Sequence, residues 1–332
     1  PSKFKLQYRA KFLGDRDFFK EFSEAAREAG LKVVARMDIN RASKEFYDTY
    51  PDWFCVDKDG RPITSQDRYF SCVNSDYYKK YIPDVLTEII EKYRPEGFAD
   101  NSWKGLGRDT ICYCSNCRNK FKEECGLELP ERVSWEDPVY REWIRWSYKC
   151  RIENWDLFNR VTQSVGGKDC LWIGMVHADP GNPSGAFQDL YEICKRSKII
   201  FCDHQSRDML NGFEQNSING SLLRLASYED ILVPESCANY VRGRRTFRLA
   251  ANPPEETRMW MIEGFAGGIS PWYHHIGGSQ NDRRQYKTPI PLFKWHAQNE
   301  KYLYNRYDLA NVGLVWNQAN ADFYGRVDVV EK

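Results

Sequence analysis

Short apolar runs alternate with longer amphipathic stretches along most of the chain. In Asp17–Gly30 the apolar positions recur at helical spacing and a glycine closes the stretch, which predicts a helix. The apolar run Leu31–Asp38 that follows predicts a strand. After a long excursion rich in turn signals, the pair recurs as a predicted helix over Asp76–Tyr93 and a predicted strand over Gly97–Asp100.

The same unit repeats through the rest of the chain. The further predicted strands are Cys170–Val176, Lys198–Asp203, Ile231–Glu235 and Gly268–Trp272, and the further predicted helices are Arg118–Glu124, Pro138–Ser164, Gln188–Lys195, Leu222–Asp230, Glu255–Phe265 and Ile290–Tyr304. A repeated strand-then-helix unit of this length indicates parallel strands joined by crossover helices. Two architectures satisfy that pattern: a doubly wound sheet and a (β/α)8 barrel.

Polar side chains at the ends of the predicted strands favour the barrel. No glycine-rich phosphate loop follows any strand, which argues against a nucleotide-binding sheet. The polar or aromatic residues at or just beyond strand ends include Arg36, Asp38, Asp100, Asn101, Asp203, His204, Glu235, Trp272 and His274. A (β/α)8 barrel, or TIM barrel, carries its active site at the C-terminal ends of its strands.

Six strands are predicted between Leu31 and Trp272, whereas a barrel needs about eight. We expect residues 1–308 to be a barrel that lacks its first strands, which precede Pro1 or, for one of them, come from Lys3–Arg9. The strand Gly97–Asp100 is then the fourth of the barrel and Ile231–Glu235 the seventh. The apolar run Asn311–Trp316 predicts a strand that opens a second α/β domain over residues 309–332.

The composition gives no reason to expect nucleic acid or membrane as a partner, and it does not indicate an activity. The formal net charge is +1, from 48 basic and 47 acidic residues, so bulk charge gives no reason to expect nucleic acid or membrane as a partner. No apolar run is long enough to span a bilayer. Aromatic residues make up 15% of the chain. They fit either a large core or a cleft in which sugar rings stack on aromatic faces.

The spacing Cys112-x-Cys114-x2-Cys117 is typical of a metal site, with unrelated buried thiols as the alternative. Tetrahedral Zn²⁺ takes four ligands, and Cys72 is the first candidate for the fourth, with Cys125 as the runner-up. Four sulfur ligands would leave no open position, so the zinc would be structural. Eleven cysteines in a chain of 332 residues do not resemble a small disulfide scaffold, which favours the cytoplasm over the periplasm or secretion.

The run Asp100-Asn101-Ser102-Trp103 followed by the three cysteines resembles the segment after the fourth barrel strand of glycoside hydrolase family 42 β-galactosidases. That resemblance implies a TIM-barrel glycosidase that acts on carbohydrate, with a zinc site completed by an earlier cysteine, here Cys72. The run Val312–Trp316 is similar to the first strand of the family's trimerisation domain, which implies a homotrimer.

One residue departs from the family 42 pattern. The family places its acid/base glutamate directly after the asparagine, and here that position is Ser102, whose hydroxyl is a poor proton donor. The runs Val34–Asp38 and Pro51–Phe54 also resemble uncharacterised relatives of this family and of α-L-fucosidases. The fucosidase likeness implies that Asp100 is the nucleophile.

Hydrolysis of a glycosidic bond needs two carboxyl groups, and Asp100 and Glu235 are the predicted pair. Their roles as nucleophile and acid stay open, and a retaining mechanism is favoured. Alternatively, Asp100 orients Arg36 or a loop amide, and Glu235 ties down a neighbouring loop. The predicted substrate-binding residues are Arg36, Asp38, Asn101, Trp103, Asp203, His204, Trp272 and His274.

The competing hypothesis is a carbohydrate-binding barrel that has lost hydrolysis, motivated by Ser102. A metal-dependent hydrolase is disfavoured because the chain has no His-x-His motif or similar cluster of histidine and aspartate ligands.

Overall fold

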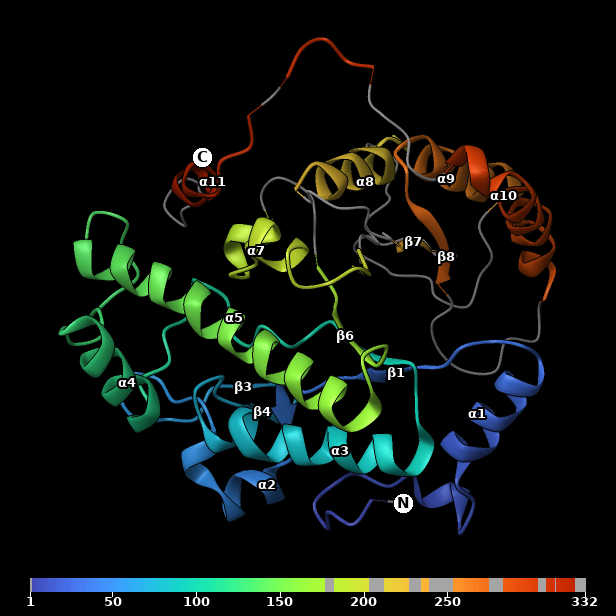
Figure 1. Cartoon of the computed structure of the whole chain (residues 1–332). Helices are drawn as coiled ribbons and strands as arrows, with labels where there is room; N and C mark the ends of the chain where they lie inside the picture. The colour runs from blue at the N-terminus through green and yellow to red at the C-terminus, as the bar shows by residue number, and fades with distance from the viewer. Residues whose placement is uncertain are drawn as a thin grey trace. The chain divides into compact units, whose positions relative to one another are not determined.

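The computed structural model describes residues 2–176, 182–202, 212–226, 234–238, 253–274, 283–303, 309–313 and 315–325 (Figure 1). The chain forms two compact units. The first comprises Pro1–Gly174, Ser184–Asp189 and Asn320–Lys332, and the second comprises Met175–Pro183 and Leu190–Ala319.

The core of the first unit is a parallel sheet in the order β1 (Val34–Met37), β5 (Gly97–Asp100) and β6 (Leu171–Gly174). Residues of β1 and β5 pair in register from Val34 with Gly97 to Met37 with Asp100. All four residues of β5 are buried, as a strand flanked on both sides requires. The predicted α/β class and the predicted strand Gly97–Asp100 are confirmed.

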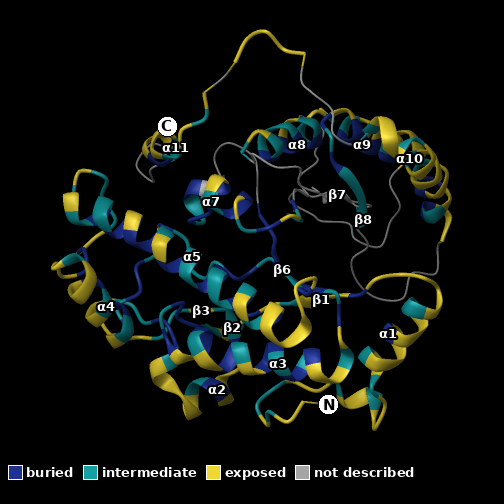
Figure 2. Ribbon diagram, in the orientation of Figure 1, coloured by how far each residue is buried: buried dark blue, intermediate teal, exposed yellow. Residues whose placement is uncertain are grey.

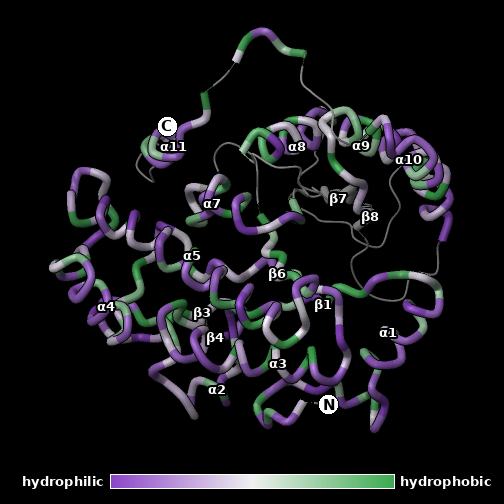
Figure 3. Tube along the Cα trace, viewed as in Figure 1, coloured by the Kyte–Doolittle hydropathy of each residue, from purple (hydrophilic) through white to green (hydrophobic). Residues whose placement is uncertain are grey.

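The first unit also contains four longer helices among its described residues. They are α1 (Phe18–Glu28), α3 (Ile82–Tyr93), α4 (Ser115–Cys125) and α5 (Pro138–Gly166), with a 3-10 turn η1 (Lys11–Leu13) and a π-helical turn η3 (Tyr77–Tyr81) before α3. Helix α5 packs against α3 and β6. Buried and exposed positions alternate along α5 in Figure 2, and hydrophobic and hydrophilic positions alternate along it in Figure 3. This alternation is typical of a helix with one face on the core.

Glycine at the end of β6 allows two tryptophans to fill the core beside it. A Cβ atom at Gly174 would lie 2.2 Å from a ring carbon of Trp155 and 2.9 Å from Nε1 of Trp103. The two indole rings meet edge to face at 5.0 Å, and both are fully buried. The glycine at position 174 therefore leaves room for two large aromatic side chains, Trp103 from the loop after β5 and Trp155 from α5.

The excursion between β1 and α3 forms a small antiparallel sheet of its own. It contains β2 (Arg41–Ala42), β4 (Arg68–Phe70) and β3 (Thr64–Ser65) in that order, with α2 (Lys44–Thr49) and the 3-10 turn η2 (Pro51–Trp53) between β2 and β3. The sheet brings Cys72, just after β4, back toward the loop that follows β5.

The second unit also contains parallel strand pairs. Val176 bridges Cys202, and β7 (Pro234–Ala238) pairs in parallel with β8 (Ser270–His274). Its helices are α7 (Leu190–Cys194), α8 (Gln215–Ala226), α9 (Pro254–Ala266) and α10 (Pro289–Leu303), with a 3-10 turn η4 (Arg284–Lys287). The short helix α6 (Asn182–Gly185) and helix α11 (Gln318–Tyr324) each contain residues of both units.

Three predicted strands differ from the structure. Lys3–Arg9 forms turns and irregular backbone, because this segment is held by side chains of α3 and η3 rather than by a sheet ladder: Glu88 accepts the Lys3 amide, and the Tyr81 hydroxyl accepts from Gln7. The described part of Lys198–Asp203 forms isolated bridges at Ile199 and Cys202 rather than a continuous strand. The described residues of Asn311–Trp316 are not in a strand, and Val312 and Val315 are both exposed.

Residues beyond this exposed run pack with the first unit. Asp322 of α11 accepts a 2.7 Å hydrogen bond from the hydroxyl of Tyr148 and lies 3.7 Å from the guanidinium of Arg108. The predicted domain boundary after residue 308 stays a prediction. No helix in the described part of the chain is long and apolar enough to cross a membrane.

Candidate functional site

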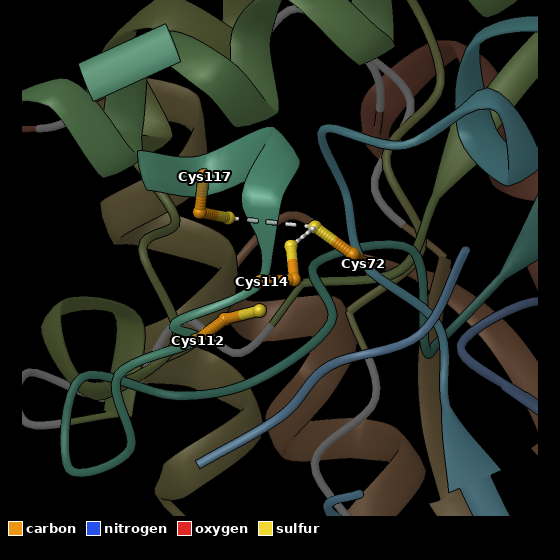
Figure 4. A group of neighbouring side chains, drawn as sticks. All are labelled: Cys72, Cys112, Cys114 and Cys117. Atoms are coloured by element: carbon orange, nitrogen blue, oxygen red, sulfur yellow. Dashed lines mark hydrogen bonds between the residues drawn. The ribbon is translucent and has the colours of Figure 1, made fainter. Parts of the chain in front are cut away.

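Four cysteines form a buried group in the first unit (Figure 4). The sulfur atoms of Cys72, Cys112, Cys114 and Cys117 all lie within 4.8 Å of one another. The Sγ atom of Cys72 is 3.4 Å from that of Cys117 and 3.5 Å from that of Cys114. No disulfide joins the cysteines that the structure describes.

Local structure explains how the three clustered cysteines converge. Cys114 is the N-cap residue of α4, and Cys117 lies in the first turn of the same helix. Cys112 precedes them in an extended loop that pairs with the excursion through a hydrogen bond from the Tyr113 amide to the Val56 carbonyl. The helix thus begins inside the cysteine motif, several residues earlier than the predicted start at Arg118.

The group fits a tetrahedral metal ion. With a Zn–S bond of about 2.3 Å, sulfur atoms at the corners of a tetrahedron lie about 3.8 Å apart, close to the separations found here. Cys72 is the fourth member, as expected, whereas Cys125 is partly exposed and outside the group. The cluster can therefore hold one metal ion through four sulfur ligands.

Asn74 supports the sulfur atoms, as outer partners of metal ligands commonly do. Its backbone amide donates to Cys72 Sγ and its side-chain amide donates to Cys117 Sγ, each at 3.4 Å. Hydrogen bonds from the neighbouring thiols, Cys114 first, hold the pKa of Cys112 well below its usual value.

Sequence reasoning missed a fifth thiol beside this group. Cys55 is buried in the same core and lines a cavity of about 20 Å³ together with Cys72, Cys112 and Cys117. A hydrogen bond with Cys112 is the main cause that raises the pKa of Cys55. The spacing of Cys55 from the other cysteines gave no signal, because the small antiparallel sheet brings it there.

Asp100 lies at the end of β5 and is completely buried. Its Oδ1 atom accepts hydrogen bonds from the backbone amide and hydroxyl of Ser102, at 2.6 and 2.8 Å, and its Oδ2 atom accepts one from the Ile39 amide at 3.1 Å. Burial raises the pKa of Asp100 to about 6 against the opposing effect of the Ser102 hydrogen bond. The alternative to catalysis is that Asp100 orients Arg36 or a loop amide. The hydrogen bonds go to loop amides and the Ser102 hydroxyl, and none of them involves Arg36.

Arg36 and Asp38 line a cavity of about 530 Å³ in the first unit. Both side chains are exposed, and neither makes an ion pair within the described residues. Arg41, Arg68 and the ring of Tyr77 line the same cavity. The charge of Asp38 is among the smaller influences that raise the pKa of Asp100.

The other predicted site residues of the first unit differ in exposure. Asn101 is half-buried. Trp103 is fully buried against Trp155 and is not among the residues that line the 530 Å³ cavity. Contact of Trp103 with a substrate stays a prediction, and its burial does not favour it.

The remaining predicted site residues belong to the second unit. Glu235 lies in β7, opposite Pro271 of β8, and His274 ends β8. Trp272 is half-buried and packs edge to face on Phe201, with ring centres 5.2 Å apart. Asp203 and His204 lie outside the described residues, as do the side chains of Glu235 and His274.

Comparison with known proteins gives a limited match in sequence. The family model described as "Hypothetical glycosyl hydrolase 6" matches residues 1–102. A β-galactosidase of Thermus thermophilus is 29% identical over 97 residues, which is 28% of this chain and 15% of that protein. A β-galactosidase of Haloferax lucentense is 26% identical over 98 residues, again 28% of this chain and 15% of that protein.

The match in fold covers nearly the whole chain. The cold-adapted β-galactosidase of Rahnella sp. R3 superposes with a TM-score of 0.72 at 12% identity, over 94% of this chain and 53% of that one. A GH42 β-galactosidase from G. stearothermophilus gives a TM-score of 0.66 at 14% identity, over 96% of this chain and 53% of that one. The chain thus spans about half the length of these solved relatives, and its predicted resemblance to family 42 β-galactosidases is confirmed.

Proposed function

We propose that this chain is the catalytic part of a glycoside hydrolase whose strands belong to a (β/α)8 barrel. The observation that carries the proposal is the fold likeness to β-galactosidases over 94% of the chain. Two further features support it. Neighbouring parallel strands follow chain order, from β1 to β5 to β6 and from β7 to β8, and polar residues stand where β1 and β5 end.

Within this proposal Asp100 is the general acid and Glu235 the nucleophile of a retaining mechanism. Burial raises the pKa of the Asp100 carboxyl group to about 6, so a larger fraction of it stays protonated near pH 6 than of an exposed aspartate, as a proton donor requires. The resemblance to family 42 assigns the nucleophile to the end of the seventh strand, where Glu235 lies. Arg36 and Asp38, on the wall of the 530 Å³ cavity, are the first candidates to contact the sugar.

Asp38 is the alternative acid. It is exposed to the cavity, whereas the Asp100 carboxyl group is enclosed by three donors. The variants Asp100→Asn and Asp38→Asn separate the two assignments, because the true proton donor loses about 10²–10⁴-fold in kcat when it is neutralised.

A carbohydrate-binding barrel without hydrolysis is the second candidate function. Two observations favour it: Ser102 occupies the position at which family 42 has an acid, and the Asp100 carboxyl group makes three hydrogen bonds within the fold. In this alternative Asp100 anchors loops, and its neutralisation leaves sugar binding intact.

We further propose zinc as the metal of the four-cysteine group and a structural role for it. Four thiolates of tetrahedral spacing suit Zn²⁺ and leave no open coordination position for a substrate. The metal would tie the loop after β5 to the segment after β4, and so support the end of β5. We also propose that the protein assembles as a homotrimer. Its compartment would be one that keeps thiols reduced.

Hydrolysis of aryl glycosides by the full-length protein tests the function. A panel that includes β-D-galactoside and α-L-fucoside is measured with the parent protein, Asp100→Asn, Asp38→Asn and Glu235→Gln. The proposal requires turnover of at least one sugar by the parent and a loss of about 10⁴-fold or more in Glu235→Gln. Sugar binding without turnover of any glycoside would instead establish the second candidate.

A further inference from the structure

Arg151 is a buried cation on α5 with no carboxylate partner among the described residues. Its side chain is 5% exposed. Nε donates to the Lys104 carbonyl at 3.0 Å, and the two terminal nitrogens donate to the carbonyls of Leu106 at 3.0 Å and Ser147 at 3.2 Å. A buried charge needs compensation, since carbonyl dipoles alone do not balance a full positive charge.

The ring of Phe187, whose centre is 4.4 Å from Arg151 Cζ, compensates part of the charge. The sulfur atoms of the four-cysteine group are the candidates for an anionic partner. Arg151 lines the same 20 Å³ cavity as Cys72, Cys112 and Cys117. Burial lowers the pKa of Arg151, and the neighbouring Cys150 and Cys117 act against that lowering. Two lysines near Cys150 have a carboxylate close by: Lys120 forms an ion pair with Glu153, and Glu153 also raises the pKa of Lys79. These sulfur atoms become thiolates when they bind a metal ion, and they would then supply the negative charge that a carboxylate gives to an ordinary buried arginine.

We propose that Arg151 is the counter-cation of the four-cysteine metal group and couples metal binding to the loop after β5. This inference rests on the proposed metal site. Four thiolates and one divalent cation carry a net charge of −2, which is costly to bury without a neighbouring positive charge. Arg151 supplies that charge from within the core, while its other contacts hold the carbonyls of Lys104 and Leu106.

The loop that Arg151 holds joins β5 to the cysteine motif. Its middle residue, Gly105, has a positive φ of 68°, and a Cβ atom there would lie 2.7 Å from a methyl carbon of Val73. The loop therefore packs tightly against the segment that carries Cys72 and Asn74. In this proposal Arg151 links the metal group to the loop, because it faces the cysteines and also binds the carbonyls of Lys104 and Leu106. Loss of the metal would leave the buried charge of Arg151 without an anion. The hydrogen bonds that hold residues 104–106 would then weaken.

Metal affinity in charge-keeping and charge-removing variants tests this role. Arg151→Gln keeps donors for the loop carbonyls but removes the charge, and Arg151→Lys keeps the charge but loses the fork of donors. Arg141→Gln is the matched control, since Arg141 is on the same helix and also donates to a backbone carbonyl, that of Trp135. Dissociation constants for Zn²⁺ and Co²⁺ are measured by chelator competition on the full-length protein.

We expect Arg151→Gln to weaken metal binding by about 10–100-fold, as loss of outer partners does at other metal sites. Arg151→Lys is expected to stay within about threefold of the parent, and Arg141→Gln to match it. Equal weakening in both Arg151 variants, or none in Arg151→Gln, overturns the inference and leaves the metal site standing. If Arg151→Gln does not fold, a loss above about tenfold in Arg151→Lys overturns it. A parent protein that binds neither ion overturns the metal site and this inference together.

Discussion

The Oδ2 atom of Asp100, at the end of β5, accepts a hydrogen bond from the backbone amide of Ile39, just beyond the end of β1. The other carboxyl oxygen accepts from Ser102, whose hydroxyl also accepts from the Asn40 amide at 3.2 Å. Asp100 thus links the loop that follows β5 to the loop that follows β1, the neighbouring strand. The amide that Asp100 binds belongs to the residue that directly follows Asp38, which lines the 530 Å³ cavity with Arg36.

The pH dependence of stability should report the burial of Asp100. A carboxyl pKa near 6 in the folded protein, against about 4 in the unfolded chain, means that the folded state binds the proton more tightly. Asp100 therefore makes the free energy of unfolding fall as pH rises from about 4 to about 6, by roughly 3 kcal/mol in total, and has no further effect at higher pH. Urea unfolding of the parent and of Asp100→Asn across this range measures the difference. Parallel curves for the two proteins would contradict the raised pKa.

The variant Ser102→Ala should move the pKa of Asp100 further up. The Ser102 hydroxyl is the main influence that lowers this pKa, so its removal leaves burial less opposed. If Asp100 is the general acid, kcat/KM of the parent falls above about pH 6, and in Ser102→Ala the fall begins at higher pH. Ser164→Ala, on the exposed end of α5, is the control. A parent whose kcat/KM instead rises through pH 6 would assign Asp100 as the ionised nucleophile.

The variant Cys72→Ser should lose the metal, whereas Cys125→Ser should keep it. Cys72 is a fully buried member of the four-sulfur group, and Cys125 is partly exposed on α4 outside it. Because metal binding contributes folding free energy, Cys72→Ser should also lower the free energy of unfolding by several kcal/mol. Metal content by atomic emission and denaturant unfolding check both statements. A Cys72→Ser protein with a full complement of metal would contradict the ligand assignment.

The variant Trp103→Ala should destabilise the fold strongly, because Trp103 fills the core beside Gly174 and Trp155. Loss of a fully buried tryptophan costs about 3–5 kcal/mol of unfolding free energy. Phe12→Ala, at a side chain that is 87% exposed, should change it by less than about 0.5 kcal/mol. The milder Trp103→Phe should leave KM for the accepted sugar unchanged. A large rise in KM in Trp103→Phe would restore Trp103 as a substrate-binding residue.

The sequence predicted the sheet and the metal group well because both depend on local signals. Gly97–Asp100 is a short apolar run that ends in an acid, and a strand buried on both faces has that pattern. The spacing of Cys112, Cys114 and Cys117 alone is enough to predict a metal site. Cys72 was found because it precedes the helix that leads to the same strand.

Features that depend on tertiary packing were not visible in the sequence. Cys55 and Arg151 reach the metal group through the antiparallel excursion and through α5, across long stretches of chain. The run Asn311–Trp316 has the apolar pattern of a strand, yet its described residues are exposed and irregular. A strand needs partners as well as propensity, and the pattern of a segment does not say whether a partner is present.

The central claim is hydrolysis through a covalent intermediate on Glu235, and trapping that intermediate tests it most directly. The full-length protein is treated with a 2-deoxy-2-fluoro derivative of whichever sugar it turns over, on an activated leaving group, and its peptides are analysed by mass spectrometry. The account predicts one fluoro-sugar per chain on the peptide that contains Glu235, and no label in Glu235→Gln. Rapid turnover of the parent glycoside with the label on another carboxylate, or with no covalent label, would contradict it.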